Sequence, residues 1–177
     1  VIELKSVDGK LSAESIANYI DNFYDDATYP HMVFPGAVYI SFPTELGTLY
    51  TLKELSEISE TCKRRNIPLF IDGARLGYGL MSEGNNVTIK DIARLSDVFY
   101  IGGTKVGALF GEAIVASNSN LLPHFFTTIK QHGALLAKGR LLGIQFETLF
   151  TDNLYYNISK HAVEQAIRIR DSFVKNG

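Results

Sequence analysis

The chain has 177 residues, of which 46% are hydrophobic, and this is enough for one domain with a sizeable core. Its formal net charge of -2 comes without a basic block, which argues against nucleic acid or an anionic membrane surface as a partner. The single cysteine, Cys62, excludes an internal disulfide and a cysteine-rich metal cluster, and it favours a reducing compartment, so we expect a cytoplasmic protein.

No apolar run approaches the roughly 18 residues that a membrane span needs. The histidines form no metal-ligand pattern, so we expect no metal. The chain starts at Val1 rather than at a methionine, and we expect it to be a piece of a longer protein.

Strand and helix signals alternate along the chain. Ser12 can cap a helix, Thr51 with Glu54 reads as a capping box, and Thr88 with Asp91 reads as another. In chain order we expect a strand over 1–5, helix over 12–24, strand over 38–42, helix over 51–65, strand over 69–71, helix over 88–95, and strands over 98–101 and 112–117. Beyond Leu121 we expect helix throughout, including a long pattern over 157–174.

This alternation predicts an α/β fold of three layers with a mostly parallel sheet, followed by a helical C-terminal stretch. The link over residues 105–111 is too short for a crossover helix. The last strand should therefore pair antiparallel with its neighbour, since that pairing requires only a turn.

In open α/β sheets the ligand lies beyond the carboxyl ends of the strands. Three loops there carry the segments 43–45, 72–75 and 102–105, and the polar start of the chain near Ser6 and Asp8 is a fourth candidate. Neighbouring parallel strands would bring an acid, an arginine and a lysine to one edge of the sheet, which is the layout of an active site.

Lys105 and Asp72 are the candidate reactive residues at this edge of the sheet. A partly desolvated lysine loses its proton readily and attacks an aldehyde, and an acid can keep the ring nitrogen of a pyridine-aldehyde cofactor protonated. Taken alone, Lys105 also fits a solvated loop lysine, and Asp72 also fits a strand-end acid that caps the next turn. The two together, each at the end of a strand, favour the cofactor.

The segments IDGARLGYGL and SDVFYIGGTKVGALFGEAIV resemble the large domain of fold type I pyridoxal-phosphate enzymes. Within that superfamily they most resemble the low-specificity threonine aldolases and β-eliminating lyases, and the similarity covers essentially the whole chain. The resemblance implies that residues 1–150 are the C-terminal part of the cofactor-binding large domain. Residues 151–177 would then be a helix leading toward a small C-terminal domain that is absent.

The resemblance also implies roles for individual residues. Lys105 would form an imine with pyridoxal 5'-phosphate, Thr104 would bind the cofactor beside it, and Asp72 would pair with the pyridine nitrogen. Arg75 would hold the substrate carboxylate, because a guanidinium can bind both oxygens. Lys130 matches a basic position near the cofactor phosphate, although it also fits an exposed helical lysine.

Glu45 is the main departure from this pattern, because the commoner threonine aldolases carry a histidine there, close to the cofactor ring. A glutamate can also act as a base, but an unperturbed glutamate has a pKa near 4.3, about two units below that of histidine. Glu45 could equally be a loop-end acid that is capping or exposed. The departure puts threonine cleavage in question more than it does the cofactor.

The leading hypothesis is a pyridoxal-phosphate-dependent lyase that acts on a β-hydroxy or β-substituted amino acid, by retro-aldol cleavage or β-elimination. The alternatives are an aminotransferase or desulfurase, a non-catalytic nucleotide-binding or regulatory α/β module, and a catalytically silent fragment. In the family, the phosphate-binding and ring-stacking residues would precede Val1, so we expect this segment alone to bind cofactor poorly. The resemblance also implies a homodimer or homotetramer.

Overall fold

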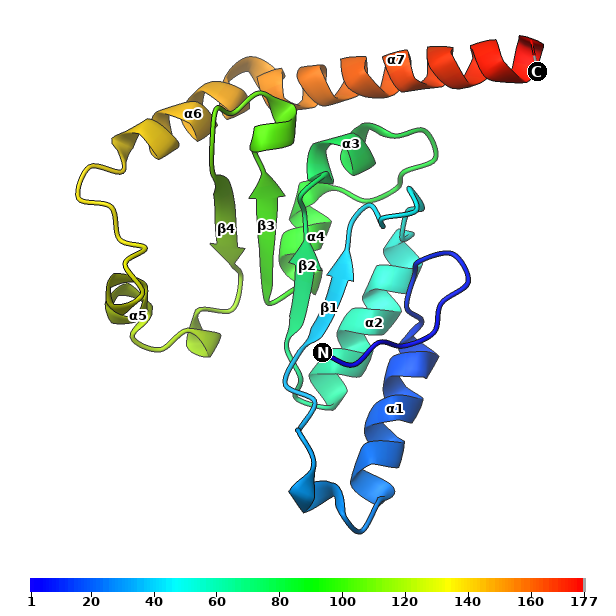
Figure 1. Ribbon diagram of the computed structural model, residues 1–177, viewed down its shortest axis with the longest axis vertical. Coiled ribbons are helices and arrows are strands. Elements are labelled where there is room, and N and C mark those ends of the chain that lie inside the picture. Colours follow the sequence, from blue (N-terminus) through cyan, green and yellow to red (C-terminus); the bar gives the residue numbers. More distant parts are fainter. Residues whose placement is uncertain (177) are drawn as a thin grey trace.

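A computed structural model describes residues 1–176, and it shows a four-stranded sheet in the order β1-β2-β3-β4 with helices around it (Figure 1). Strands β1 (Val38–Ser41), β2 (Leu69–Asp72) and β3 (Val98–Gly102) are parallel, and β4 (Glu112–Ala116) runs antiparallel to β3. The expected α/β class, with one antiparallel strand after a short link, is confirmed.

The strand register places two of the expected loops side by side. Ser41 pairs with Asp72 at the carboxyl ends of β1 and β2, and Phe99 pairs with Ile71 one strand further along. The loops that follow β1 and β2 therefore leave the sheet at the same level.

Helices α1 (Ala13–Asp25), α2 (Leu52–Arg64) and α4 (Ile89–Leu95) each begin with a capping box. In such a box the N-cap hydroxyl accepts from a backbone N–H three residues later, and the side chain of that later residue accepts from the N-cap N–H. The capping pairs are Ser12 with Ser15, Thr51 with Glu54, and Thr88 with Asp91.

The core lies on the face of the sheet that α2 covers. Leu55, Ile58 and Cys62 of α2 are buried in one cluster with the inward residues of the strands. Burial raises the pKa of the Cys62 thiol to about 11, so this cysteine acts as a small apolar side chain rather than a reactive group. The opposite face of the sheet carries Tyr39, which is 56% exposed, and Ile114, which is 65% exposed.

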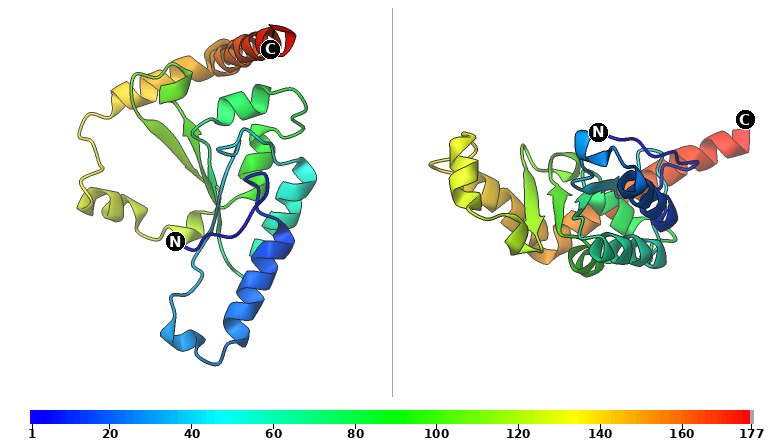
Figure 2. Two further views of the ribbon diagram at one scale, coloured as in Figure 1. Left: turned by 45° about the vertical axis from the view of Figure 1, so that its right-hand side comes forward. Right: turned by 90° about the horizontal axis from the view of Figure 1, so that it is seen from below.

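The C-terminal half supplies a long helix that crosses the carboxyl ends of the strands (Figure 2). This helix, α7 (Leu154–Asn176), packs against α3 (Leu76–Met81), the helix that follows β2. The remaining elements are α5 (Phe125–Gln131), α6 (Arg140–Phe150) and the short 3₁₀ turns Tyr29–His31, Thr104–Val106, Ser119–Leu121 and Thr151–Asn153. Among the described residues, no helix has the length and apolar character of a membrane span.

Two expectations about secondary structure are wrong. Residues 1–5 form no strand, because no neighbouring strand hydrogen-bonds to them, and Leu4 alone of this segment packs against the core. The helix expected beyond Leu121 is interrupted over residues 132–139. Gly133 adopts a φ of 68° just past the end of α5, a left-handed conformation that commonly ends a helix.

Candidate active site

The loops after β2 and β3 are packed backbone to backbone. The N–H of Gly102 donates to the carbonyl oxygen of Gly73 at 2.9 Å. A Cβ atom on Gly73 would lie 1.9 Å from the carbonyl oxygen of Tyr100, and one on Gly102 would lie 2.3 Å from that of Ala74. Glycine at both positions therefore permits the close approach of the two loops.

Asp72 is the last residue of β2 and is held from two directions. Its Oδ1 accepts from the N–H of Ala74 at 2.9 Å, and its Oδ2 accepts from the hydroxyl of Tyr39 on β1. Burial raises the pKa of Asp72, but hydrogen bonds from Tyr100, Tyr39 and Ala74, together with the positive charge of Lys105, outweigh it, so the pKa is lowered overall. Asp72 is thus a half-buried carboxylate that stays ionised.

The phenols around Asp72 remain neutral donors. Burial and the hydrogen bond to Asp72 raise the pKa of Tyr39 to about 12, and the same causes raise the pKa of Tyr100. Phe70 lies between these rings, stacked on Tyr39 at a centroid distance of 5.2 Å and tilted against Tyr100 at 5.9 Å. An aromatic row therefore crosses β1, β2 and β3 just below the carboxylate.

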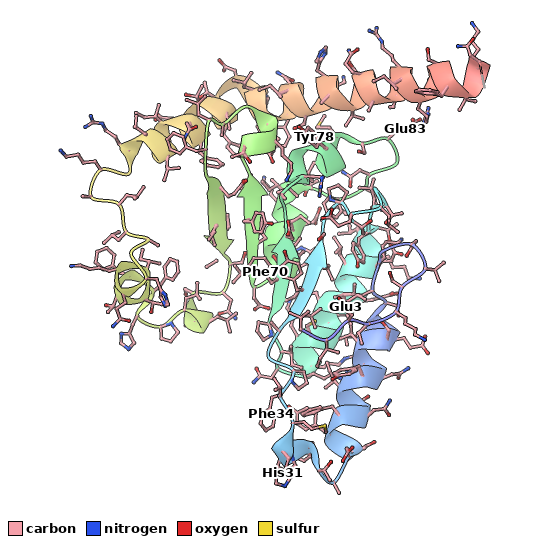
Figure 3. The ribbon with its side chains drawn as sticks, in the orientation of Figure 1. Glu3, His31, Phe34, Phe70, Tyr78 and Glu83 are labelled. Atoms are coloured by element: carbon pink, nitrogen blue, oxygen red, sulfur yellow. The ribbon has the colours of Figure 1, made fainter. Side chains whose placement is uncertain are left out.

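Lys105 lies in the 3₁₀ turn that follows β3, with its side chain exposed. Its carbonyl oxygen accepts from the hydroxyl of Tyr78, which projects from α3. Figure 3 shows Tyr78 beyond the carboxyl ends of the strands, with Phe70 lower on the sheet. The hydrogen bond between Gly102 and Gly73 brings the loop of Lys105 beside the loop of Asp72, and the positive charge of Lys105 contributes to the lowered pKa of Asp72.

Arg75 and Glu45 form an ion pair that joins the loops after β1 and β2. Nη1 of Arg75 lies 2.9 Å from Oε1 of Glu45 and 3.0 Å from its Oε2. The chain start also reaches this region, because the carbonyl oxygen of Asp8 accepts from the hydroxyl of Thr48 at 2.7 Å. The three expected loops and the start of the chain near Asp8 thus gather at one edge.

Lys130 is placed apart from the other candidates. It is exposed on α5, and Figure 1 shows this helix toward the opposite end of the sheet from the carboxyl ends of β1, β2 and β3. Its expected position near a cofactor phosphate stays a prediction, because the described chain does not bring it to Asp72 or Lys105.

Two groups of candidate site residues were not predicted from the sequence. Glu112, the first residue of β4, accepts from the N–H of Gly103 and from the hydroxyl of Thr104, at 3.0 Å for the latter. Tyr39 donates to Asp72 from the neighbouring strand β1, and Tyr100 on β3 contributes to the lowered pKa of Asp72. The sequence holds a signal for the tyrosines, since each stands two residues before the end of its strand, on the same face as the strand-end residue.

The arrangement fits a pyridine-aldehyde cofactor. The half-buried carboxylate of Asp72 can accept a hydrogen bond from a protonated ring nitrogen, and the exposed amine of Lys105 can bond to an aldehyde. Gly73 and Gly102 lack side chains, so the loop after Asp72 and the loop before Lys105 can approach each other closely.

Comparison with known proteins gives consistent matches. A family model described as "Beta-eliminating lyase" matches residues 1–172. The low specificity L-threonine aldolase of Pseudomonas aeruginosa is 34% identical over 154 residues, which are 87% of this chain and 43% of that protein. A protein of the same name from Pseudomonas sp. is 33% identical over 162 residues, or 92% of this chain and 46% of its own length.

Among solved structures, a threonine aldolase from Leishmania major is 48% identical, with a TM-score of 0.86. The match covers 93% of this chain and 47% of that one. The chain thus spans about half the length of these relatives.

Proposed function

Because the chain belongs to the beta-eliminating lyase family, we propose that it forms part of a pyridoxal-phosphate-dependent lyase acting on a β-hydroxy or β-substituted amino acid. One observation carries the proposal: Asp72, Lys105, Arg75 and Glu45 gather on adjoining loops at the carboxyl edge of a single sheet. The relatives named threonine aldolases favour retro-aldol cleavage as the reaction.

Two residues of this chain would hold the cofactor. When bound, pyridoxal phosphate supplies a ring that withdraws electrons from a carbon next to the substrate nitrogen. Lys105 would hold it covalently through Nζ. Asp72 would accept a hydrogen bond from the ring nitrogen, and its lowered pKa supports this role because the carboxylate stays charged at neutral pH.

Arg75 is suited to bind the α-carboxylate of the substrate. Within residues 1–176, Nη1 of Arg75 contacts Glu45, while Nε and Nη2 have no hydrogen-bond partner. These two nitrogens form the fork that binds both oxygens of a carboxylate. One arginine can therefore hold the substrate and orient Glu45 at the same time.

Glu45 is suited to take the proton from the β-hydroxyl group of the substrate. As that proton moves to a carboxylate oxygen, the hydroxyl becomes the carbonyl of an aldehyde product and the Cα–Cβ bond breaks. The ion pair with Arg75 supports this assignment, because it fixes the carboxylate relative to the group that would bind the substrate.

The resemblance to this family also supports proposals about the substrate class, the location and the oligomeric state. We infer a small-molecule amino-acid substrate, a cytoplasmic location and a homodimer or homotetramer. Light scattering on the intact protein would measure the oligomeric state, and a monomer at micromolar concentration would contradict that inference.

Borohydride trapping tests the central step. The intact protein is incubated with the cofactor, reduced and digested, and we expect the cofactor label on Lys105. Lys105→Arg should lose the label, whereas Lys90→Arg, a matched change at an exposed lysine on α4, should keep it. A label on another residue, or none, would refute the proposal.

Product analysis separates the lyase from the alternative reactions. Retro-aldol cleavage yields an aldehyde and glycine, β-elimination yields a keto acid and ammonia, and desulfuration releases sulfur. A keto acid formed with an amino group kept on the cofactor would indicate an aminotransferase instead.

A further inference from the structure

We propose that Glu112 is a positioning residue for Lys105, and that its carboxylate clamps the two residues before the lysine. The inference rests on the proposed function, because the position of Lys105 matters only if its amine holds the cofactor. Glu112 itself need not touch either the cofactor or the substrate.

The contacts of Glu112 reach across the hairpin between β3 and β4. Oε2 accepts from the N–H of Gly103, and Oε1 accepts from the hydroxyl of Thr104 at 3.0 Å. The antiparallel register pairs Glu112 with Gly102, so the carboxylate starts directly opposite the end of β3. Both oxygens of one side chain are thereby used on two consecutive residues of the loop.

Two further side chains complete the restraint from other elements. Tyr155 of α7 donates to the carbonyl oxygen of Gly102 at 3.1 Å, and Tyr78 of α3 donates to that of Lys105. Each residue from 102 to 105 is therefore hydrogen-bonded to a side chain from outside the loop. Glu112 supplies the only carboxylate among them, and hydrogen bonds to a charged acceptor are the stronger kind.

This restraint has a reason in the local sequence. The loop contains Gly102, Gly103 and, after the lysine, Gly107 with a φ of 100°. Glycine leaves the backbone free to adopt many conformations, so a glycine-rich loop does not fix its lysine by itself. A carboxylate bound at two points reduces that freedom before any cofactor arrives, which is preorganisation.

The clamp also changes the expected role of Thr104. Its hydroxyl donates to Glu112, so its proton is already engaged within the protein. Thr104 can still accept a hydrogen bond through its oxygen, but in this structure it acts first as an anchor for the loop.

Glu112→Gln tests the clamp with minimal change of shape. The amide keeps one acceptor oxygen for Thr104, but its NH₂ group cannot accept from the N–H of Gly103. In the intact cofactor-free protein, we expect faster hydrogen exchange of the amides over residues 103–106. Cofactor affinity, followed by visible absorbance, should fall roughly ten- to hundredfold, as expected for a lost hydrogen bond to a charged group. Glu112→Ala, which removes both contacts, should lower it further.

Glu60→Gln is the matched control, since Glu60 is an exposed glutamate on α2 whose side chain makes no hydrogen bond within the described chain. The inference is overturned if Glu112→Gln leaves loop exchange and cofactor affinity unchanged. It is also overturned if affinity falls only in step with the unfolded fraction, measured by urea denaturation. Faster loop exchange in a protein whose Lys105 takes up no cofactor label would instead refute the proposed function.

Discussion

Nη1 of Arg75 lies within 3.0 Å of both carboxylate oxygens of Glu45, and this contact ties together loops that follow two different strands. The side chains are 38% and 68% exposed, so solvent screens the pair and it contributes at most about 1 kcal/mol to folding. Its importance therefore lies in orientation rather than in stability.

Glu45→Gln should abolish most of the retro-aldol activity that we propose for the intact protein. If Glu45 takes up the proton of the substrate hydroxyl, kcat should fall roughly 10²- to 10⁴-fold while the free energy of unfolding changes little. Steady-state kinetics would measure this, with Glu83→Gln as the control, because Glu83 is exposed in the loop after α3 (Figure 3). A kcat that survives the substitution would remove Glu45 from the mechanism.

Arg75→Lys should mainly weaken substrate binding. A lysine keeps the positive charge but lacks the planar fork that binds both oxygens of a carboxylate, so KM should rise about tenfold or more. Kinetics over a range of amino-acid concentrations would measure the split between KM and kcat. If only kcat fell, Arg75 would act through Glu45 and not on the substrate.

Tyr39→Phe should lower stability in a pH-dependent way. The folded-state pKa of Asp72 is lowered, so its ionised form stabilises the fold above the unfolded pKa, and this contribution is lost as the pH falls through the folded pKa. Removing the Tyr39 hydroxyl removes part of that effect, by up to about 1 kcal/mol near pH 7, and the difference from wild type should shrink toward about pH 3.

Urea denaturation at several pH values would measure this difference. Tyr24→Phe is a suitable control, because Tyr24 is 48% exposed in an aromatic cluster at the C-terminal end of α1. A destabilisation by Tyr39→Phe that stayed constant across the pH range would show that packing, not the charge of Asp72, is responsible.

Tyr155→Phe should destabilise the protein by about 1–3 kcal/mol, because it leaves buried polar groups without their partner. The hydroxyl of Tyr155 accepts from the N–H of Gly77 at 3.0 Å and donates to the carbonyl oxygen of Gly102 at 3.1 Å. Urea denaturation measures the loss. Tyr156→Phe, at the adjacent residue, should cost less, since no hydrogen bond of the Tyr156 hydroxyl is found within residues 1–176.

The sequence predicted those features that depend on local chemistry. Capping boxes involve residues three apart, so Thr51 with Glu54 and Thr88 with Asp91 could be read directly. The antiparallel last strand followed from the length of one link. Because parallel neighbours end at the same edge, the approach of Asp72 and Lys105 was predictable as well.

Features that depend on tertiary packing were not predictable. Helix α3 has the sequence LGYGLM, whose two glycines disfavour a helix in isolation. Packing against α7 explains why a helix forms here and why Gly77 is a glycine, since a Cβ on Gly77 would lie 2.2 Å from Oγ of Ser159 on α7. The role of Glu112 depends on the register of β3 and β4, which the sequence does not reveal.

The phenol of Tyr155 has a mechanical consequence. It is fully buried near the start of α7 and bonds at once to α3 and to the end of β3. A shift of the first turn of α7 must therefore either break a buried hydrogen bond or pull on both segments together. A displacement of the first turn of α7 would therefore reach the loop of Lys105 by two routes, through the hydroxyl of Tyr155 and through the direct packing of α7 against the turn Thr104–Val106.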